Sequence, residues 1–311
     1  MHAALEPSPD PAARENDAHA IACMEVWGGS QAFDAAVSVP GNDVRIHSSP
    51  YRGAAAGGDI YYVSNCAGGI ITRFFLADVS GHGEDVARIA AELRSLMRRH
   101  INTANQSRFA IALNKAFADL DLAGRFATAV LLTYFAPTDH IILCNAGHPR
   151  PLLYRAADDR WDLLDASTPG VLSSRQAGAA AVGISNLPLG ILDPTDYQQL
   201  ALRLAPGDLL VLYTDALMEA AGPDGRQLGE DGLLTFARAL TPAQRADAPA
   251  ILHRRVLEHT SHAELDDDAT IIALHHNGAD PEPVRGLGGR LTKLAHMLGL
   301  GAVDSGPGAE S

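Results

Sequence analysis

The stretch L-A-D-V-S-G-H-G, residues 76–83, ends an apolar run at Asp78 and continues into a turn that contains two glycines. Three further aspartates lie where an apolar, strand-like run ends or begins: Asp59 in G-G-D-I-Y, Asp215 in L-Y-T-D-A and Asp267 in D-D-D-A-T. Carboxylates held together at the ends of buried strands repel one another unless positive charge lies between them. Hard oxygen ligands without clustered Cys or His favour Mg²⁺ or Mn²⁺ over Zn²⁺. The sequence therefore predicts a carboxylate-bound divalent metal centre.

Each aspartate also has a local explanation, because Asp caps helices and forms turns. Asp78 could cap the helix that we predict after it, and Asp208 in P-G-D-L-L resembles an ordinary turn residue, to which we assign no role. Asp215, in contrast, follows the apolar run 209–213, where a lone unpaired carboxylate would be costly to desolvate. The coincidence of four such positions favours the metal centre.

Seven short motifs occur in order along the chain: G-G-D-I-Y (57–61), D-V-S-G-H-G (78–83), F-A-T-A (126–129), N-A-G-H-P (145–149), L-P-L-G-I (187–191), Y-T-D-A-L (213–217) and D-D-A-T (267–270). Together they resemble the signatures of the SpoIIE-like branch of the metal-dependent (PPM, protein phosphatase 2C-type) serine/threonine phosphatases. That branch includes the RsbU-type regulatory phosphatases. The resemblance extends over roughly residues 46–274.

The periodicity of apolar residues predicts clustered antiparallel strands interrupted by pairs of helices, which is typical of an α+β domain. The resemblance implies more: a central antiparallel β-sandwich flanked by helices on both faces, a four-layer αββα arrangement with metals at one end. We expect strands over 45–49, 60–66 and 70–79, two helices, an antiparallel meander of 126–136, 140–145 and 152–155, strands over 198–204 and 209–214, helices over 229–240 and 242–259, and a strand over 270–276.

Three regions follow from this organisation. We expect a partly disordered N-terminal extension over residues 1–43, a catalytic domain over 44–276, and a Gly- and Pro-rich tail over 277–311. The start of the extension, to about Asn16, is rich in Pro, Ala and charge, and the tail is rich in Gly and Pro.

Charge and hydropathy exclude several classes of protein. The formal net charge of −13 and the pI near 5.3 argue against nucleic-acid binding, which needs Lys and Arg to neutralise phosphates. No apolar stretch approaches the ~20 residues of a transmembrane helix, and the start M-H-A-A-L-E lacks a secretory signal. Cys23, Cys66 and Cys144 form no C-x-x-C pair. We therefore expect a cytoplasmic protein without a membrane span.

The resemblance implies two Mn²⁺ or Mg²⁺ ions and assigns their ligands by motif position. Asp78 would span both ions, with the Val79 backbone carbonyl as a further ligand. Asp59 would bind one ion, and Asp215 and Asp267 would bind the other. Two such ions, ~3.5–4 Å apart, can activate a bridging hydroxide for in-line attack on a phosphomonoester, so that no protein nucleophile is required.

Other residues near these positions keep open roles. His82 could protonate a leaving serine, orient water near the ions or support the turn; it lies four residues after Asp78, whereas the histidine of eukaryotic members lies two after the corresponding aspartate. His148 has the same ambiguity, and we interpret it as structural. Asp268 could support the preceding aspartate, bind a weak third ion or cap a turn. Ala216 replaces the usual glycine, which is harmless if its φ is negative.

The resemblance implies a phosphatase that acts on phosphoserine or phosphothreonine of a small regulatory protein, typically an anti-sigma-factor antagonist of the STAS type. Control would come from a separate activator protein, the tails or a homodimer. A catalytically silent binding module with the same fold is the alternative, although such a module would be expected to lack a metal aspartate. A nucleotide cyclase is a weaker alternative, because its hairpin continues G-G-D-E-F, whereas this chain continues Ile60-Tyr61.

Overall fold

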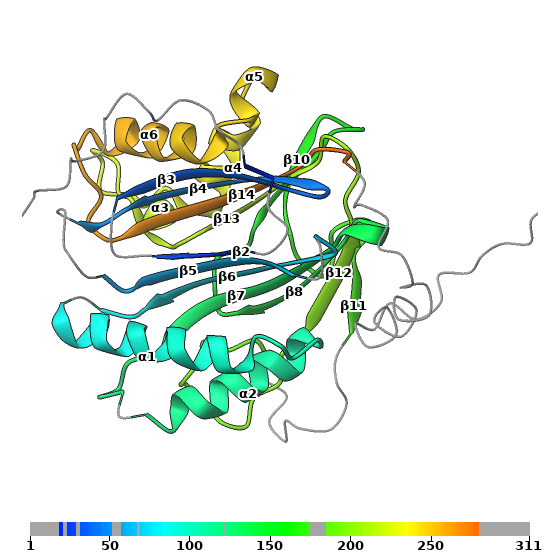
Figure 1. Ribbon diagram of the computed structural model, residues 1–311. Helices are drawn as coiled ribbons and strands as arrows, with labels where there is room; N and C mark the ends of the chain where they lie inside the picture. Colours follow the sequence, from blue (N-terminus) through cyan, green and yellow to red (C-terminus); the bar gives the residue numbers. More distant parts are fainter. Residues whose placement is uncertain are drawn as a thin grey trace, which may run out of the picture.

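The computed structural model describes residues 19–20, 24–28, 32–51, 57–66, 69–81, 83–120, 122–174 and 185–279. Two sheets lie face to face in it, and helices cover the outer side of each (Figure 1). This arrangement confirms the predicted α+β fold with four layers in the order αββα.

The first sheet combines strands from the beginning, the middle and the end of the described chain. Its strands are β1 (His19–Ala20), β3 (Phe33–Val39), β4 (Asn42–Ser49), β9 (Leu152–Arg155), β10 (Arg160–Leu163), β13 (Leu209–Tyr213) and β14 (Ala269–His276). Their order is β1-β3-β4-β14-β13-β9-β10, and every pairing except the parallel β1–β3 contact is antiparallel.

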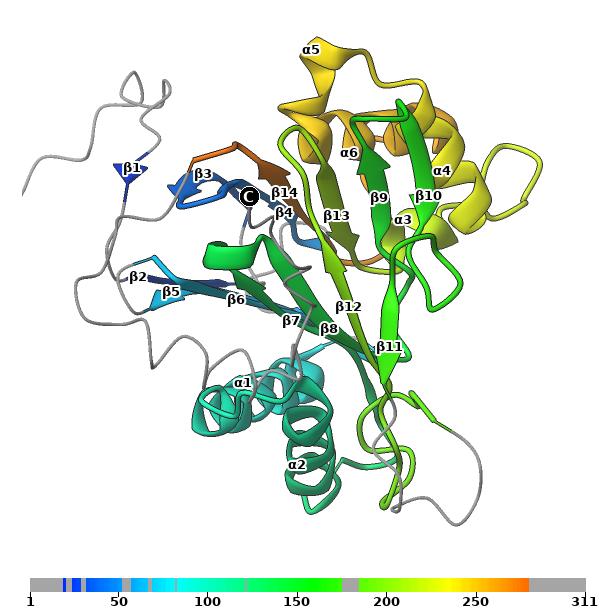
Figure 2. The ribbon, with the colours of Figure 1, turned by 90° about the vertical axis from the view of Figure 1, so that its right-hand side faces the viewer.

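The second sheet is antiparallel throughout. Its strands are β2 (Met24–Gly28), β5 (Asp59–Cys66), β6 (Ile71–Val79), β7 (Ala127–Phe135), β8 (His140–Ala146), β11 (Leu172–Ser174) and β12 (Gln199–Arg203). Their order is β11-β12-β8-β7-β6-β5-β2 (Figure 2).

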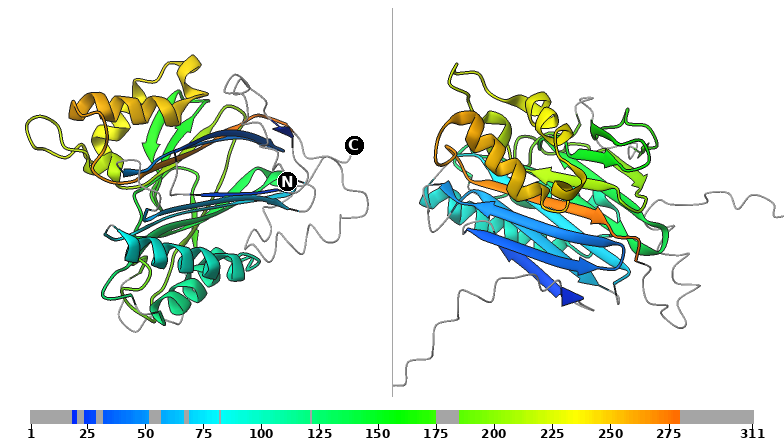
Figure 3. Two further views of the ribbon diagram at one scale, coloured as in Figure 1. Left: turned by 60° about the vertical axis from the view of Figure 1, so that its left-hand side comes forward. Right: turned by 90° about the horizontal axis from the view of Figure 1, so that it is seen from above.

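The helices divide between the two outer faces, as the rotated views show (Figure 3). The second sheet carries α1 (Glu84–His100) and α2 (Gln106–Ala118), whereas the first carries α3 (Ala216–Glu219), α4 (Gly229–Arg238), α5 (Pro242–Arg245) and α6 (Ala248–Thr260). A 3-10 turn at Ala136–Thr138 links β7 to β8. Within the part of the chain that the structure describes, no helix has the length and apolar character needed to cross a membrane.

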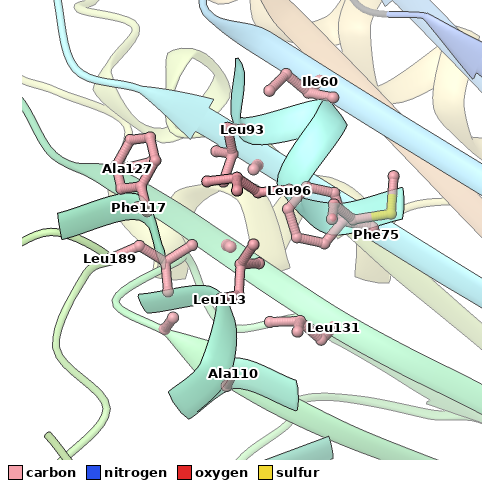
Figure 4. Packing of buried hydrophobic residues seen from close by; sticks show 14 of the residues in the cluster. Ile60, Phe75, Leu93, Leu96, Ala110, Leu113, Phe117, Ala127, Leu131 and Leu189 are labelled. Carbon is pink, nitrogen blue, oxygen red and sulfur yellow. The ribbon is translucent and has the colours of Figure 1, made fainter. Parts of the chain in front are cut away.

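Alternation along each strand builds separate cores on its two faces. In β6, Phe74 and Leu76 point between the sheets, whereas Phe75 points toward the helices. Figure 4 shows Phe75 among apolar side chains that include Leu93 of α1 and Leu113 of α2. The central strands of both sheets are therefore buried on both faces.

The predicted meander is wrong in its third strand. β7 and β8 pair as expected, but β9 lies in the other sheet, between β13 and β10. The turn after β8 redirects the chain: Gly147 has a φ of +66°, and the Asn145 side chain accepts a hydrogen bond from His148 N (2.7 Å) and donates one to His148 O (2.8 Å). The free edge of β8 is taken by β12.

Two predicted boundaries also change. The helix expected over 242–259 is divided into α5 and α6, because Pro249 is tolerated only in the first turn of a helix and so begins a new one.

Strands β2 and β3 belong to the sheets, so the domain begins before residue 44. Val37 and Val39 of β3 are buried in the core between the sheets. Residues 1–18 of the predicted extension and 280–311 of the predicted tail lie outside the described residues.

Asp208, which the sequence left without a role, anchors the loop between β12 and β13. The residue is buried, and its side chain accepts hydrogen bonds from Arg155 Nη1 (2.8 Å), Ala156 N (2.8 Å) and Ala205 N (2.9 Å). A buried carboxylate with three donors ties β9 to the start of β13.

We expect Asp208→Ala to lower the free energy of unfolding by about 3 kcal/mol, because the largely buried Arg155 guanidinium would lose its counter-charge. Urea denaturation measures this difference. Asp224→Ala is the control, since Asp224 is exposed and its contact with Arg226 is 3.7 Å long. Equal stability of the two variants would contradict the anchoring role.

Candidate metal centre

Asp59 and Asp78 lie directly opposite each other. Asp59 is the first residue of β5, Asp78 is the last but one of β6, and the two are partners in the antiparallel register. Directly opposed side chains of neighbouring strands are the closest pair on a sheet face. Strand pairing alone therefore places two acidic groups together at one end of the second sheet.

The first sheet brings its own acidic residues to the same end. Asp215 follows β13 after Thr214, and Asp267 precedes β14 by two residues. The Thr214 hydroxyl donates a hydrogen bond to Asp59 Oδ2 (3.0 Å), which crosses from one sheet to the other. Thr214 Oγ1 in turn accepts a hydrogen bond from Thr270 N (2.9 Å) within the first sheet, so the hydroxyl that contacts Asp59 is itself held in place.

Asp268 forms a second link between the sheets. Its Oδ2 accepts a hydrogen bond from Gly58 N (2.8 Å) and its Oδ1 accepts one from Tyr51 N (2.8 Å). Its side chain is nearly buried, and it holds the glycine pair that precedes Asp59. A turn-supporting role is thus visible in the structure, while a role in binding a third ion stays a prediction.

The glycine pair makes room for ligands. A Cβ on Gly58 would lie 2.7 Å from the Val79 carbonyl oxygen and 3.0 Å from Asp78 Oδ1. A Cβ on Gly57 would lie 2.0 Å from Asp268 Oδ2. The absence of side chains here lets the Val79 carbonyl and the Asp78 carboxylate face the same small space, as the predicted ligand set requires.

Electrostatics shows that the carboxylates share one site. Burial, and then the charge of Asp78, raise the pKa of Asp59 well above its ordinary value. Burial raises the pKa of Asp78 to about 8, with further contributions from the charges of Asp215 and Asp267. The pKa of Asp215 rises to about 6, first through burial and then through the charges of Glu219 and Asp267. The carboxylates therefore repel one another at this end of the sandwich.

The residues fit divalent ions. Asp59 Oδ1 is buried and has no hydrogen-bond partner, which is costly unless a cation neutralises it. Within the described ranges, no three Asp, Glu, His or Cys side chains gather closely enough to hold one ion by themselves. The three carboxylates predicted for one ion, Asp78, Asp215 and Asp267, are thus not gathered around a single point. Mg²⁺ commonly takes one or two carboxylates and keeps several waters, so a sparser set of protein ligands would suit it.

His148 lies close to the acidic residues, and its interpretation as structural stays a prediction. It is buried, its Nδ1 lies 2.9 Å from Thr128 Oγ1, and burial lowers its pKa to about 3, so the ring is neutral. Thr128 is the partner of Asp78 across β6 and β7, which places His148 behind the acidic cluster. His82 lies outside the described residues, and its role stays a prediction.

Ala216 does not disturb the site. It is the first residue of α3, in helical conformation, and is not among the described residues with positive φ. The usual glycine is therefore not needed for backbone reasons, and the Cβ costs nothing in conformational strain.

Sequence reasoning missed three residues of this centre. Thr214 and Thr270 both hydrogen-bond to the Asp59 side chain and so lower its pKa. Glu219 raises the pKa of Asp78 and of Asp215 by its charge. The threonines were present in Y-T-D and D-D-A-T, but only the fold shows that both reach the same carboxylate. Glu219 follows Asp215 by one helical turn, which was a usable signal.

Similar proteins share this fold. A structure of the RsbU and RsbW domains of a Mycobacterium tuberculosis protein has a TM-score of 0.61 at 24% identity, covering 79% of this chain and 63% of that one. The PP2C phosphatase domain of SpoIIE from Bacillus subtilis has a TM-score of 0.58 at 18% identity, covering 75% and 62%. The SiaA PP2C domain of Pseudomonas aeruginosa has the same score and identity, covering 75% and 85%.

Sequence comparison identifies the family. Phosphoserine phosphatase RsbP of Bacillus subtilis is 27% identical over 187 residues, which are 57% of this chain and 40% of RsbP. The chain thus spans less than half the length of that relative. A profile of the family described as Stage II sporulation protein E (SpoIIE) matches residues 71–185 and 181–277, most of the described domain. The chain belongs to the SpoIIE family, as its seven motifs predicted.

Proposed function

We propose that this protein is a metal-dependent serine/threonine phosphatase that hydrolyses phosphoserine or phosphothreonine on a regulatory protein. The proposal is supported by one observation above all: carboxylates from both sheets converge at one end and raise one another's pKa. All four principal aspartates are present, which favours an active enzyme over a silent binding module. Membership of the SpoIIE family and the similarity to phosphoserine phosphatase RsbP point to the same chemistry.

Different residues of the protein would bind the ions, orient the ligands and admit the substrate. Asp59, Asp78, Asp215, Asp267 and the Val79 carbonyl would hold two Mn²⁺ or Mg²⁺ ions. When bound, such ions supply an activated water and positive charge for the phosphoryl group. Thr214 keeps the Asp59 carboxylate oriented. A recess beside α3 is lined in part by Ala216, Glu219 and Asp267, and a substrate would approach the proposed site from there.

The substrate class follows from the family and from the reaction. We propose a phosphorylated antagonist of an anti-sigma factor, of the STAS type, as the protein substrate. A separate activator or a second copy of the chain would control the enzyme. We also propose that it acts in the cytoplasm and binds no nucleic acid, in keeping with its net charge of −13.

We expect hydrolysis of p-nitrophenyl phosphate to require added Mn²⁺ or Mg²⁺ and to cease in EDTA, because sites built from oxygen ligands hold these ions reversibly.

Asp78→Asn and Asp215→Asn should each reduce kcat by on the order of 10³-fold or more, since the ions contribute several kcal/mol to the stabilisation of the transition state. Steady-state kinetics measures the metal requirement with p-nitrophenyl phosphate and the kcat of the two variants with a phosphoserine peptide. The exposed Asp224→Asn is the control. Full turnover in chelator would sink the proposal, and wild-type inactivity with both ions would favour the silent module.

Metal-free stability should depend on pH in a defined direction. The pKa of Asp78 is raised to about 8 in the folded protein, so its contribution to stability is complete below its unfolded value near 4 and is lost as pH rises through 8. In EDTA we therefore expect Asp78→Asn to have a higher Tm than the wild type at pH 8.5, with the difference shrinking toward pH 5. Calorimetry at both pH values tests this, and a wild type more stable than the variant at pH 8.5 would refute it.

A comparison of leaving groups tests His82. If His82 donated a proton to the leaving serine, His82→Ala would slow a phosphoserine peptide by ~10²–10⁴-fold and barely affect p-nitrophenyl phosphate, whose leaving group needs no proton. We expect similar losses on both substrates, as a structural or water-orienting role implies. A strong selective loss on the peptide would show that His82 is the general acid.

A further inference from the structure

One arginine beside the metal centre has no counter-ion. Arg125 is partly buried, and no hydrogen bond or ion pair engages its guanidinium within the described residues. The best-buried paired arginines have carboxylate partners: Arg155 contacts Asp208 and Arg245 contacts Asp159. The other described arginines without a side-chain partner are exposed: Arg88, Arg99 and Arg108. A partly desolvated, unpaired charge is costly unless an anion that is not part of the chain satisfies it.

The backbone holds Arg125 firmly. The turn 122–125 is closed by a hydrogen bond from Arg125 N to Leu122 O (2.9 Å), and its two central residues, Ala123 and Gly124, have φ values of +48° and +80°. Positive φ at an alanine is uncommon and costs free energy, and such conformations often lie at functional sites. Leu122 is buried in the core beneath α1 and α2, so the turn is anchored on its inner side.

The same turn is joined to the loop that begins at Asp78. Phe126 N donates to Ser80 Oγ (3.0 Å), and Ser80 N donates to Phe126 O (2.9 Å). A Cβ on Gly81 would lie 3.6 Å from Arg125 Nε, so the guanidinium passes alongside this loop. Arg125 therefore lies next to the acidic site without forming an ion pair with any of its carboxylates.

We propose that Arg125 binds the non-bridging oxygens of the substrate's phosphoryl group. This inference rests on the proposed phosphatase function and adds a substrate-binding residue to it. A guanidinium matches a phosphate with two parallel N–H donors, and such charge-assisted hydrogen bonds are stronger than neutral ones. The ions would contact the reacting side of the phosphoryl group, and Arg125 would bind it from the side of the 78–83 loop. A phosphate dianion would supply the counter-charge that the folded chain does not.

The test compares Arg125→Ala and Arg125→Lys with Arg108→Ala, which removes an exposed, unpaired arginine from the first turn of α2. Two quantities are measured in Mg²⁺: the inhibition constant of inorganic phosphate during hydrolysis of p-nitrophenyl phosphate, and the Kd of inorganic phosphate by calorimetry. We expect Arg125→Ala to weaken both by about tenfold or more, as loss of a hydrogen bond to a charged group implies. Arg125→Lys should recover part of the loss, because lysine keeps the charge but not the paired donors. Arg108→Ala should match the wild type.

The outcomes are distinguishable. Phosphate affinity within twofold of the wild type in a folded Arg125→Ala protein overturns the inference and leaves the phosphatase proposal standing. A fall in Tm and kcat without a change in phosphate affinity assigns Arg125 a structural role and also overturns it. If the wild type shows no turnover, the proposed function fails, and the calorimetric Kd still decides whether Arg125 binds phosphate; a wild type that binds no phosphate overturns both.

Discussion

The site depends on one constraint, the meeting of two sheets at an end where each presents carboxylates. Asp59 is buried and accepts a hydrogen bond from Thr214 of the opposite sheet, while Asp268 accepts one from Gly58 in the other direction. These bonds fix the spacing of the sheets at this end. They also bring acidic groups so close that burial and mutual repulsion raise their pKa values. The hydrogen bonds that position the carboxylates therefore also bring their charges close enough to repel one another.

The apolar cores on both faces of the sheets keep these repelling carboxylates in place. Apolar side chains fill the space between the sheets and below both helical layers, so every strand that carries a site residue is buried on both faces. A packed scaffold can keep several repelling carboxylates in place because the apolar burial over the whole domain exceeds their repulsion. In the proposed function the same charges would bind divalent ions, and their repulsion would lower the stability of the metal-free protein.

Charge is distributed unevenly around this centre. Most partly buried arginines serve the scaffold: Arg150 contacts Glu230 and Asp165 and so joins the turn after β8 to α4. Arg125 differs, because it stands beside the acidic site without a carboxylate partner. A scaffold arginine has its partners within the fold, whether carboxylates or, as for Arg255, carbonyl oxygens, whereas a ligand-binding arginine has its partner on the ligand. The location of its partner therefore distinguishes a structural arginine from a ligand-binding one, which the residue type alone does not.

The sequence by itself determined the family, the α+β class, most strand positions and the placement of four aspartates beside strand ends, because apolar periodicity and short motifs are local properties of the chain. Only the tertiary structure decided which strands pair. β9 lies in the other sheet rather than beside β8, since pairing depends on which edges are free in space. The same holds for Thr214, Thr270, Glu219 and Arg125. Their roles come from neighbours far away in the sequence, and a linear pattern carries no record of such contacts.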